Sequence, residues 1–580
     1  MGGKNTMKSA FLLCLTTLSC VAALAQAPAP LSPPQVEAYA NIGRVWGFLK
    51  YYHPAVGSKT YNWDSVLVAA LPRDSSVMSA EIGLQVVDRL LEVAGPVPDC
   101  QVCPPEFDSA QAVNVDWGWM EKNALLRSDQ MAQLQRMRDQ REPGENGYIG
   151  EMFEDRDLPL YKKFLMDAAY DDIDHFDHRH RLMTLFHYWQ VIESFFPYKH
   201  TANPDWDATL REAVPRFVQA HGVPQFQLAM LWIANQINDS HANASYSPHI
   251  LAHWYGRYRF PFELRVVDDR AVVVNAFLSD SLKTQSKVQI GDRVVAIDGQ
   301  EIWAHLRQRG EYIGASHPAA KERYMLLYAI TGIQPRATLT LVRAGDTLQL
   351  IVDRYLIDRL PARQMRQRTW ERVGAGQDFL LIRAAQLESS SEARRLMRKA
   401  KRAQGMIIDL RAYGLWSNGF MTMFEHLQPA EATFTMHASG RYDYPGFLEI
   451  PWPQALGEGN QRGQTLQQKP VVLLIGNNVL SNDEYMIMHL QAHPHTYHLG
   501  SPTGGALGPI GRIDMPGGFQ AHFTQHGVTY ADGTPIFGRG VKLDETVLPT
   551  RADIRAGRDP VLERAIEYLH EVTAPVGDQP

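Results

Sequence analysis

Residues 471–490 place a short apolar run directly before a helical pattern. Residues 471–475 are continuously apolar, which is typical of a strand covered on both faces of a sheet. A turn follows, and the spacing from Ser481 onward predicts a helix with acidic residues, including Glu484, in its first turn. A serine at such a turn is exposed, and the next backbone N–H can stabilise an oxyanion. Ser481 is therefore a candidate nucleophile; the alternative is that it only caps the helix.

Composition and charge are those of an ordinary globular protein. Of the 580 residues 45% are hydrophobic and 21% are charged, and the formal net charge is −6. No long basic run occurs, so nothing favours a nucleic-acid partner. A chain of this length is expected to form about three or four domains.

The N-terminus has the pattern of a secretory signal peptide. Two lysines precede an apolar run over residues 10–24, and a small-x-small cleavage site ends at Ala25. The run is too short to span a membrane comfortably. We expect residues 1–25 to be removed and the mature chain to be periplasmic or extracellular, without an integral membrane span. Lipid anchoring at Cys20 stays open.

Cys100 and Cys103 are the two cysteines of the expected mature chain. Outside the cytoplasm we expect them to form a disulfide that closes a tight loop. The alternatives are a redox site and a zinc site. The two prolines that follow Cys103 disfavour the helix of a thioredoxin-like site, and no further zinc ligands are close in sequence.

Two segments of residues 32–256 share one apolar helical pattern, at 38–54 and 182–197. The ungapped matches at a constant offset of 143 residues are Trp46 with Trp189, Pro54 with Pro197, Trp63-Asp64 with Trp206-Asp207, and Pro72 with Pro215. Matches of this kind indicate an internal duplication of a helical unit. The copies cover about residues 38–100 and 181–243.

The second copy ends in Ser240-His241, whereas the first copy has proline opposite His241. The helical unit therefore needs no histidine there to fold. We interpret His241 as a candidate functional residue, with a capping or satisfied core histidine as the alternative. Aspartates and histidines crowd together at 171–180, but no established ligand spacing is met. We expect no metal and no other cofactor.

Residues 258–355 change to short β-type runs separated by turn signals. The segment from Gly291-Asp292 to Gly299 resembles the signature of bacterial PDZ domains, which bind a peptide C-terminus by adding it to a sheet edge. The usual carboxylate-binding loop cannot be placed here. The sequence therefore predicts a PDZ-like domain without establishing that it captures peptides.

Residues 366–580 alternate strand and helix patterns, which predicts α/β layering. Strands are expected at 379–382, 406–410 and 471–475, and a helix at 391–403. Residues 432–456 are aromatic and proline-rich without periodicity. They are predicted to form a packed surface loop or a lid.

Several motifs of this last part occur together in one peptidase family. They are Ile407-Ile-Asp-Leu-Arg411, Ser481-Asn-Asp-Glu484, Gly500-Ser-Pro-Thr-Gly-Gly505, Pro516-Gly-Gly518, Gly540-Val-Lys-Leu-Asp544, Val547-Leu-Pro-Thr550 and Gly557-Arg-Asp559. Over about residues 182–570 the chain resembles the tail-specific (C-terminal processing) serine peptidases. The resemblance implies a multidomain α/β fold in which a duplicated helical region and a PDZ-like β-rich domain precede a crotonase/Clp-like ββα core.

The same family pairs its serine either with a downstream lysine or, in its Tricorn-like branch, with a Ser-His pair that precedes the PDZ domain. No lysine lies between Lys469 and Lys542, and Ser240-His241 matches the Ser-His pair. The resemblance implies that His241 is the general base of Ser481 and that Ser240 orients it.

The resemblance also implies an oxyanion hole formed by the N–H groups of Gly414 and Asn482. One departure concerns the acid of the Tricorn-like site, a glutamate just before the Gly540-Val541 dipeptide, where this chain has none. Glu484, Asp544 and Glu545 are the candidate substitutes.

We therefore expect an exported serine-type endopeptidase that hydrolyses peptides or unfolded proteins through an acyl-enzyme, without metal or nucleotide. One alternative is a catalytically weak or inactive relative that binds peptides through its PDZ-like domain. Another is a metal-dependent hydrolase that uses the 171–180 cluster or His493, His495 and His498. The sequence does not indicate the oligomeric state.

Overall fold

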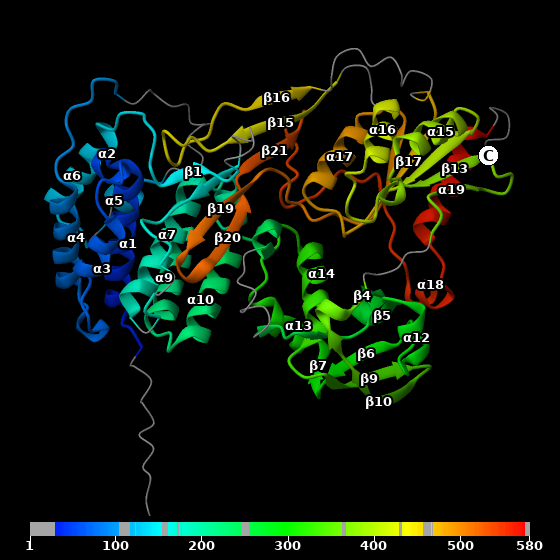
Figure 1. Ribbon diagram of the computed structural model, residues 1–580, viewed down its shortest axis with the longest axis horizontal. Helices are drawn as coiled ribbons and strands as arrows, with labels where there is room; N and C mark the ends of the chain where they lie inside the picture. Colours follow the sequence, from blue (N-terminus) through cyan, green and yellow to red (C-terminus); the bar gives the residue numbers. More distant parts are fainter. Residues whose placement is uncertain are drawn as a thin grey trace, which may run out of the picture.

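The chain folds into a helical region, a β-rich domain and an α/β core, joined by two small sheets (Figure 1). The computed structural model describes residues 30–103, 116–121, 123, 125–153, 161–170, 173–175, 177–244, 254–361, 367–427, 432–455, 466 and 468–574. The expected signal peptide lies outside these residues. None of the described helices is both long and apolar enough to cross a bilayer.

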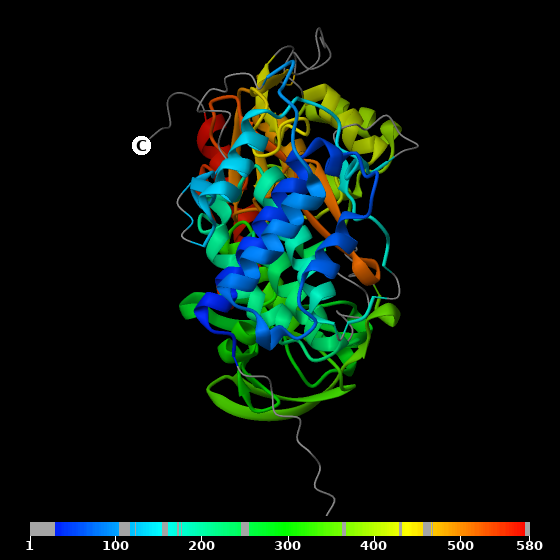
Figure 2. The same cartoon turned by 90° about the vertical axis from the view of Figure 1, so that its left-hand side faces the viewer.

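Two sets of three helices form most of the helical region, which faces the viewer in Figure 2. The first set is α1 (Pro33–Tyr52), α3 (Trp63–Ala70) and α4 (Ala80–Ala94), and the second is α7 (His178–Phe195), α9 (Trp206–Val218) and α10 (Val223–Asn235). The shorter helices are α2 (Pro54–Gly57), α5 (Gly118–Glu121), α6 (Ser128–Asp139) and α8 (Lys199–Ala202). The third helix of each set begins 143 residues from its counterpart, as does the second.

A pair of buried tryptophans joins the first two helices in each set. The indole N–H of Trp46 donates to the carbonyl of Trp63 at 3.2 Å, and that of Trp63 donates back to Trp46 at 3.1 Å. Trp189 and Trp206 exchange the same two bonds, both at 3.1 Å. Each pair satisfies both indole donors inside an apolar contact, so it fixes one helix against the next.

The charges beside these tryptophans differ between the two sets. In the first set, Lys50 and Asp64 form an ion pair at 2.9 Å with both side chains 0% exposed. The equivalent positions of the second set hold two acids, Glu193 and Asp207. Within the second set Arg211 pairs with Asp207 at 2.5 Å, and Lys199 of α8 pairs with Glu193 at 2.8 Å. Arg44, from the first set, also binds the Asp207 carboxylate through Nε at 2.7 Å, so an ion pair crosses between the two sets.

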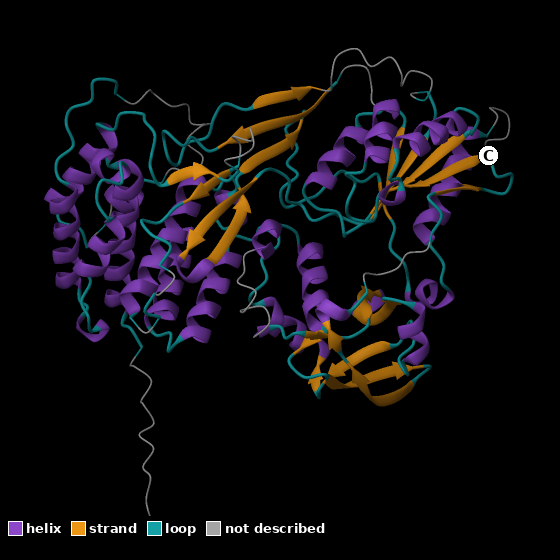
Figure 3. Cartoon of the chain, viewed as in Figure 1, coloured by secondary structure: helices purple, strands orange, loops and turns teal. Residues whose placement is uncertain are grey.

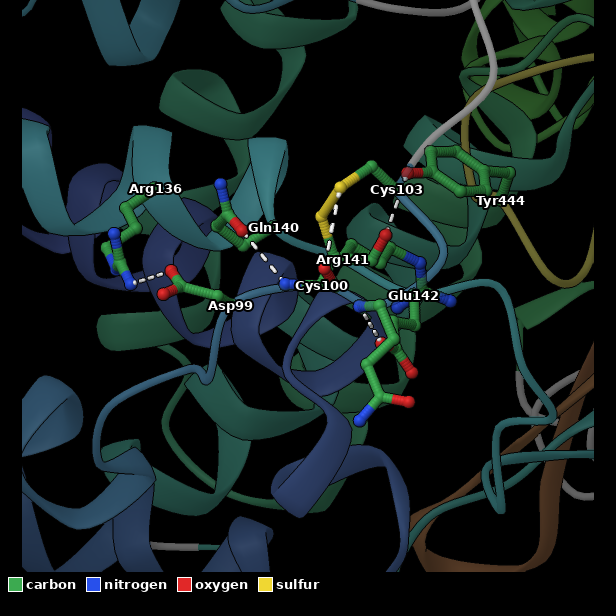
Figure 4. Close-up of a disulfide and its surroundings, with 9 residues drawn as sticks. Asp99, Cys100, Cys103, Arg136, Gln140, Arg141, Glu142 and Tyr444 are labelled. Carbon is green, nitrogen blue, oxygen red and sulfur yellow. Dashed lines mark hydrogen bonds and ion pairs between the residues drawn. A yellow bond between two sulfur atoms is a disulfide. The ribbon is translucent and has the colours of Figure 1, made fainter.

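A disulfide joins Cys100 and Cys103, whose Cα atoms lie 5.1 Å apart (Figure 4). The Cys100 N–H donates to the side-chain carbonyl of Gln140 at 2.9 Å, just after α6. The next residue, Arg141, accepts a hydrogen bond from the hydroxyl of Tyr444 at 3.2 Å. The disulfide loop is thus held where the helical region meets the loop after β15 (Thr433–Ser439).

The β-rich domain has a sheet in the order β10-β9-β6-β5-β4, with β7 paired to β6, and each of these pairs of strands is antiparallel. Its strands are β4 (Phe262–Val267), β5 (Ala271–Phe277), β6 (Arg293–Ile297), β7 (Gln300–Glu301), β9 (Arg336–Arg343) and β10 (Asp346–Asp353). Its helices are α12 (Asp280–Gln285), α13 (Ile302–Gly310) and α14 (Pro318–Ala329). A separate small sheet contains β3 (Tyr258–Arg259), β8 (Thr331–Gly332) and β11 (Tyr355–Leu356).

The α/β core contains the expected buried strands (Figure 3). Its sheet has the order β12-β13-β14-β17-β18-β22 and is parallel except for β12. The strands are β12 (Trp370–Val373), β13 (Phe379–Arg383), β14 (Gly405–Asp409), β17 (Val471–Ile475), β18 (Thr496–Gly500) and β22 (Glu545–Thr546). Side chains of α15 (Ser390–Ala400), α16 (Asn418–Leu427) and α17 (Asn482–Gln491) pack on one face, and α19 (Pro560–Thr573) covers the other; α18 (Arg551–Ala556) precedes it.

The chain then leaves this core and returns to the helical region. One connecting sheet joins β19 (Ile510–Met515) and β20 (Phe519–Thr524) to β2 (Lys162–Phe164) and β1 (Ile149–Glu151), and its apolar side chains enter the core of the helical region. The other has the order β16-β15-β21, from Trp452–Ala455, Thr433–Ser439 and His526–Tyr530. The expected loop at 432–456 therefore contains two strands, because pairing with distant β21 supplies an order that its local pattern lacks.

Candidate active site

Ser481 lies at a sharp turn between β17 and α17. Its backbone has φ 59° and ψ −125°, an uncommon conformation for a residue with a Cβ. Such strain costs about 1–3 kcal/mol and persists only where the surrounding structure enforces it. A partly exposed serine at a strained strand-to-helix turn is the geometry of a nucleophile elbow.

The Glu484 carboxylate enforces this turn from inside. It accepts hydrogen bonds from the N–H groups of Ser481 at 3.0 Å, Gly505 at 2.8 Å and Ala506 at 3.2 Å, and from the Thr503 hydroxyl. Burial raises the pKa of Glu484 to about 7, although these four donors favour the ionised form. Glu484 therefore ties the segment 503–506 to the first turn of α17.

His241 lies in a short 3₁₀ turn (Ser240–Ala244) after α10, and its side chain is buried. Its Nδ1 lies 2.7 Å from the hydroxyl oxygen of Thr524, and that hydroxyl donates to Asp239 at 2.9 Å. Because the single hydroxyl proton is committed to Asp239, the Thr524 oxygen must accept from a protonated Nδ1. Nε2 then carries the free lone pair that a general base needs.

Asp239 is the acid that sequence reasoning did not assign. It is fully buried, and besides the Thr524 hydroxyl it accepts from the N–H of Thr524 and, at 2.9 Å, from the N–H of His241. Burial lowers the pKa of His241, and the Asp239 charge opposes this shift. The signal for Asp239 was its place directly before Ser240-His241, whereas nothing local marks Thr524, which belongs to β20.

The three acids proposed as substitutes lie elsewhere. Asp544 pairs with His498 at 2.9 Å, Glu545 pairs with Arg564 at 3.1 Å, and Glu484 is engaged at the serine turn. None of the three is a hydrogen-bond partner of His241 among the described residues. The acid that reaches the imidazole is Asp239, through a threonine of another element.

The serine turn and the histidine turn meet at the segment 503–506. The Ser240 hydroxyl donates to the Gly504 carbonyl at 2.7 Å, and the Gly504 N–H donates to the Val479 carbonyl at 2.8 Å, two residues before Ser481. Nε2 of His241 is buried and has no hydrogen-bond partner in the described part of the chain. The structure thus brings both turns to one segment and leaves Nε2 unbonded.

The two predicted oxyanion donors differ in their surroundings. The Asn482 N–H is in the first turn of α17, where a helix offers its N–H groups no internal acceptor. The Gly414 N–H instead donates to the Asp483 carboxylate at 2.7 Å, and the Leu415 N–H donates to the same group at 3.1 Å. Gly414 is therefore not available to an oxyanion in this conformation, because a neighbouring acid occupies it.

Histidine and acidic residues elsewhere do not form a metal centre within the described ranges, where no group of three or more His, Cys, Asp or Glu side chains could hold an ion. Part of the 171–180 cluster falls outside those ranges. His493 contacts the Leu466 carbonyl at 3.3 Å, and His498 pairs with Asp544.

Solved structures with a similar fold were found, whereas no curated protein sequence matches the chain. The structure of mature CPAF complexed with lactacystin is 14% identical, with a TM-score of 0.51, and the match covers 68% of this chain and 98% of CPAF. The photosystem II D1 C-terminal processing protease is 17% identical, with a TM-score of 0.38 and coverage of 66% and 98%. The tricorn protease is 13% identical, with a TM-score of 0.33 and coverage of 69% and 37%.

A sequence-family comparison agrees with the geometry of the core. Residues 378–547, which run from β13 to β22, match the model of peptidase family S41. This segment includes the strained serine and the segment 503–506. Residues 378–547 are therefore similar to peptidase family S41.

Proposed function

We propose that the protein is an exported serine endopeptidase in which Ser481 is the nucleophile and His241 the general base. The observation that carries this proposal is the hydrogen-bonded row Asp239–Thr524–His241. It holds the imidazole proton on Nδ1 and leaves Nε2 free to accept a proton. A strained serine alone would also suit a helix cap. The row supplies the acid and the tautomer that a catalytic histidine requires.

In the reaction, Nε2 of His241 takes the proton of the Ser481 hydroxyl as the oxygen attacks the peptide carbonyl. The Asn482 N–H stabilises the oxyanion, and the imidazolium then donates its proton to the leaving amine. In the second half Nε2 takes a proton from water as the water attacks the acyl-enzyme carbonyl, and the imidazolium then returns a proton to the Ser481 oxygen as the ester bond breaks. Asp239, acting through Thr524, stabilises the imidazolium in both halves.

Gly414 becomes a second oxyanion donor only in a conformation in which Asp483 has released it. This requirement favours a second candidate, a catalytically weak protein of the same fold that binds peptides. The occupied Gly414 N–H is the observation that supports it, and turnover distinguishes the two candidates.

The finer domain assignments belong to the same proposal. Matching helix starts and the two reciprocal tryptophan pairs support a duplicated helical unit. The six-stranded sheet with α13 and α14 supports a PDZ-like domain, which would recruit or gate peptides or unfolded proteins. The sequence of residues 1–25 supports export.

The test is cleavage of casein by the chain beginning at Gln26, with and without EDTA. Ser481→Ala and His241→Ala are expected to abolish an EDTA-resistant activity. Thr524→Val removes the hydroxyl at nearly constant volume and is expected to lower kcat about 100-fold or more, while Thr524→Ser keeps it and retains most activity.

Labelling by a fluorophosphonate provides the matched control for folding and access. The Thr524→Val chain should label more slowly, and its labelling should set in at a lower pH because the imidazolium has lost its stabilising partner, whereas Thr524→Ser should label like the parent. Cleavage that survives Ser481→Ala contradicts the nucleophile. Equal activity of the two Thr524 variants contradicts the row, and peptide binding without turnover favours the second candidate.

A further inference from the structure

A large groove opens directly beside the histidine turn. Its volume is about 1000 Å³, and it lies between α8, the N-terminal half of α14, β15 and the segment after β21; we call it the Arg539 groove. Much of its wall is apolar, and the rings of Tyr198 and Phe537 stack there with centroids 4.1 Å apart. The groove is therefore large enough for several residues of an extended peptide.

Two residues of its wall are bonded to the candidate active site. Ser316 accepts at its hydroxyl from the Ser240 N–H at 2.9 Å and donates its own N–H to the Ser240 hydroxyl at 3.1 Å. The Gly538 N–H donates to the Gly505 carbonyl at 3.1 Å, in the segment held by Glu484. The wall of the groove is thus bonded directly to the histidine turn and, through Gly505 and Glu484, to the serine turn.

The charges of the groove do not balance. Arg270 pairs with Glu322 at 3.3 Å, which leaves Lys321 and Arg539 as cations. Among the described residues, neither the Lys321 ammonium nor the Arg539 guanidinium makes a hydrogen bond or an ion pair. Partial burial lowers the pKa of Lys321. Burial likewise lowers the pKa values of the three histidines that line the groove, His200, His317 and His437. The groove thus presents two uncompensated positive charges beside apolar walls.

The chemistry that completes such a site is a carboxylate attached to an otherwise apolar peptide. A terminal carboxylate is usually captured by a cluster of free backbone N–H groups. Here those groups are already used: the N–H of Lys321 donates to the His317 carbonyl, and those of Arg539 and Gly540 donate to the Ile536 carbonyl. The cations alone therefore remain, which favours a carboxylate on a side chain.

We propose that the Arg539 groove is a substrate subsite that selects peptide segments in which Asp or Glu alternates with apolar residues. The inference rests on the proposed function, because it makes the groove a subsite of that reaction. Lys321 and Arg539 bind the acidic side chain, and the Tyr198–Phe537 wall contacts its apolar neighbours.

The test measures peptide binding to the mature chain carrying Ser481→Ala, so that nothing is cleaved. The probes are fluorescein-labelled, C-terminally amidated nonapeptides Ala-Leu-Xaa-Phe-Xaa-Leu-Xaa-Phe-Ala, with Xaa as Glu, Gln or Lys, read by fluorescence anisotropy. The Glu peptide is expected to bind about tenfold more tightly than the Gln peptide and to weaken with salt.

Lys321→Gln/Arg539→Gln is expected to bring the Glu and Gln peptides within about twofold of each other. Arg394→Gln/Lys401→Gln makes the same charge change at exposed positions of the core and should leave the preference intact. Equal binding of the Glu and Gln peptides to the parent overturns the proposal. A preference for the Glu peptide that survives Lys321→Gln/Arg539→Gln overturns the proposal too. So does tighter binding that is obtained only by giving the Gln peptide a free C-terminal carboxylate in place of its amide.

Failure of the proposed function would look different. A wild-type chain that neither cleaves casein nor reacts with a fluorophosphonate would refute the peptidase assignment, while the binding assay would still report on the groove. In an active chain, the cleavage sites in casein should be enriched in Asp and Glu. The charge-reversed Lys321→Glu/Arg539→Glu should exchange that enrichment for Lys and Arg.

Discussion

Replacing Glu484 with Gln should change the pH dependence of stability by a predictable amount. Burial raises the pKa of Glu484 from 4.5 to about 7 in the folded chain. Between these values the folded state binds more protons than the unfolded state, so its stability falls as pH rises. The stabilising contribution is complete below pH 4.5 and is lost as pH rises through 7. At about 1.4 kcal/mol per pKa unit, the loss is about 3 kcal/mol.

The measurement is urea unfolding of the wild-type and Glu484→Gln chains at several values between pH 4.5 and 8.5. Gln places an amide against N–H donors at every pH, so it carries a constant cost. The difference in unfolding free energy between the wild type and Glu484→Gln should therefore shrink by about 3 kcal/mol between pH 4.5 and 8.5. Only the wild-type chain has to ionise a buried carboxyl group as the pH rises. Glu388→Gln, at an exposed position of the same core, should show no such trend. A difference that is flat, or that grows with pH, would mean that the four donors outweigh burial.

Two further substitutions test the interior. Lys50→Met leaves the buried Asp64 carboxylate without its cation and should destabilise the chain by about 3–5 kcal/mol in urea melts, with partial recovery when Asp64→Leu is added. Gly500→Ala would place a Cβ 1.9 Å from the Ile475 carbonyl oxygen at φ 138° and should cost about 2–5 kcal/mol in the same melts. Gly557→Ala, also left-handed but facing open space, should cost only about 1 kcal/mol, and equal losses would contradict the steric argument.

Local pattern accounts for the parts of the fold that sequence could predict. The buried strand β17 and the helix after Ser481 follow from an apolar run and from helical spacing, which depend on neighbours in the chain. The helix expected at 391–403 is α15, shorter by a turn at its C-terminal end. Amphipathic spacing therefore identifies elements well and their ends less well.

Contacts between distant segments account for the rest. Thr524 meets Asp239 across 285 positions, and no periodicity or motif marks a threonine for that task. The N–H of Gly414 is occupied because Asp483 turns back toward it, which depends on side-chain direction within the first turn of α17. A family motif can mark the serine, but the hydrogen-bond partners of each group follow only from the tertiary arrangement.

The charges of the helical region cross between its two halves in both directions. Arg44 of the first half reaches Asp207 of the second, and Arg211 of the second half reaches Glu37 of the first. Two copies of one half would not reproduce this exchange, because the arginine and the acid that meet across the boundary come from different positions of the two halves. The halves therefore fit each other as the unlike subunits of a heterodimer do, and only the second half ends in the turn that carries His241.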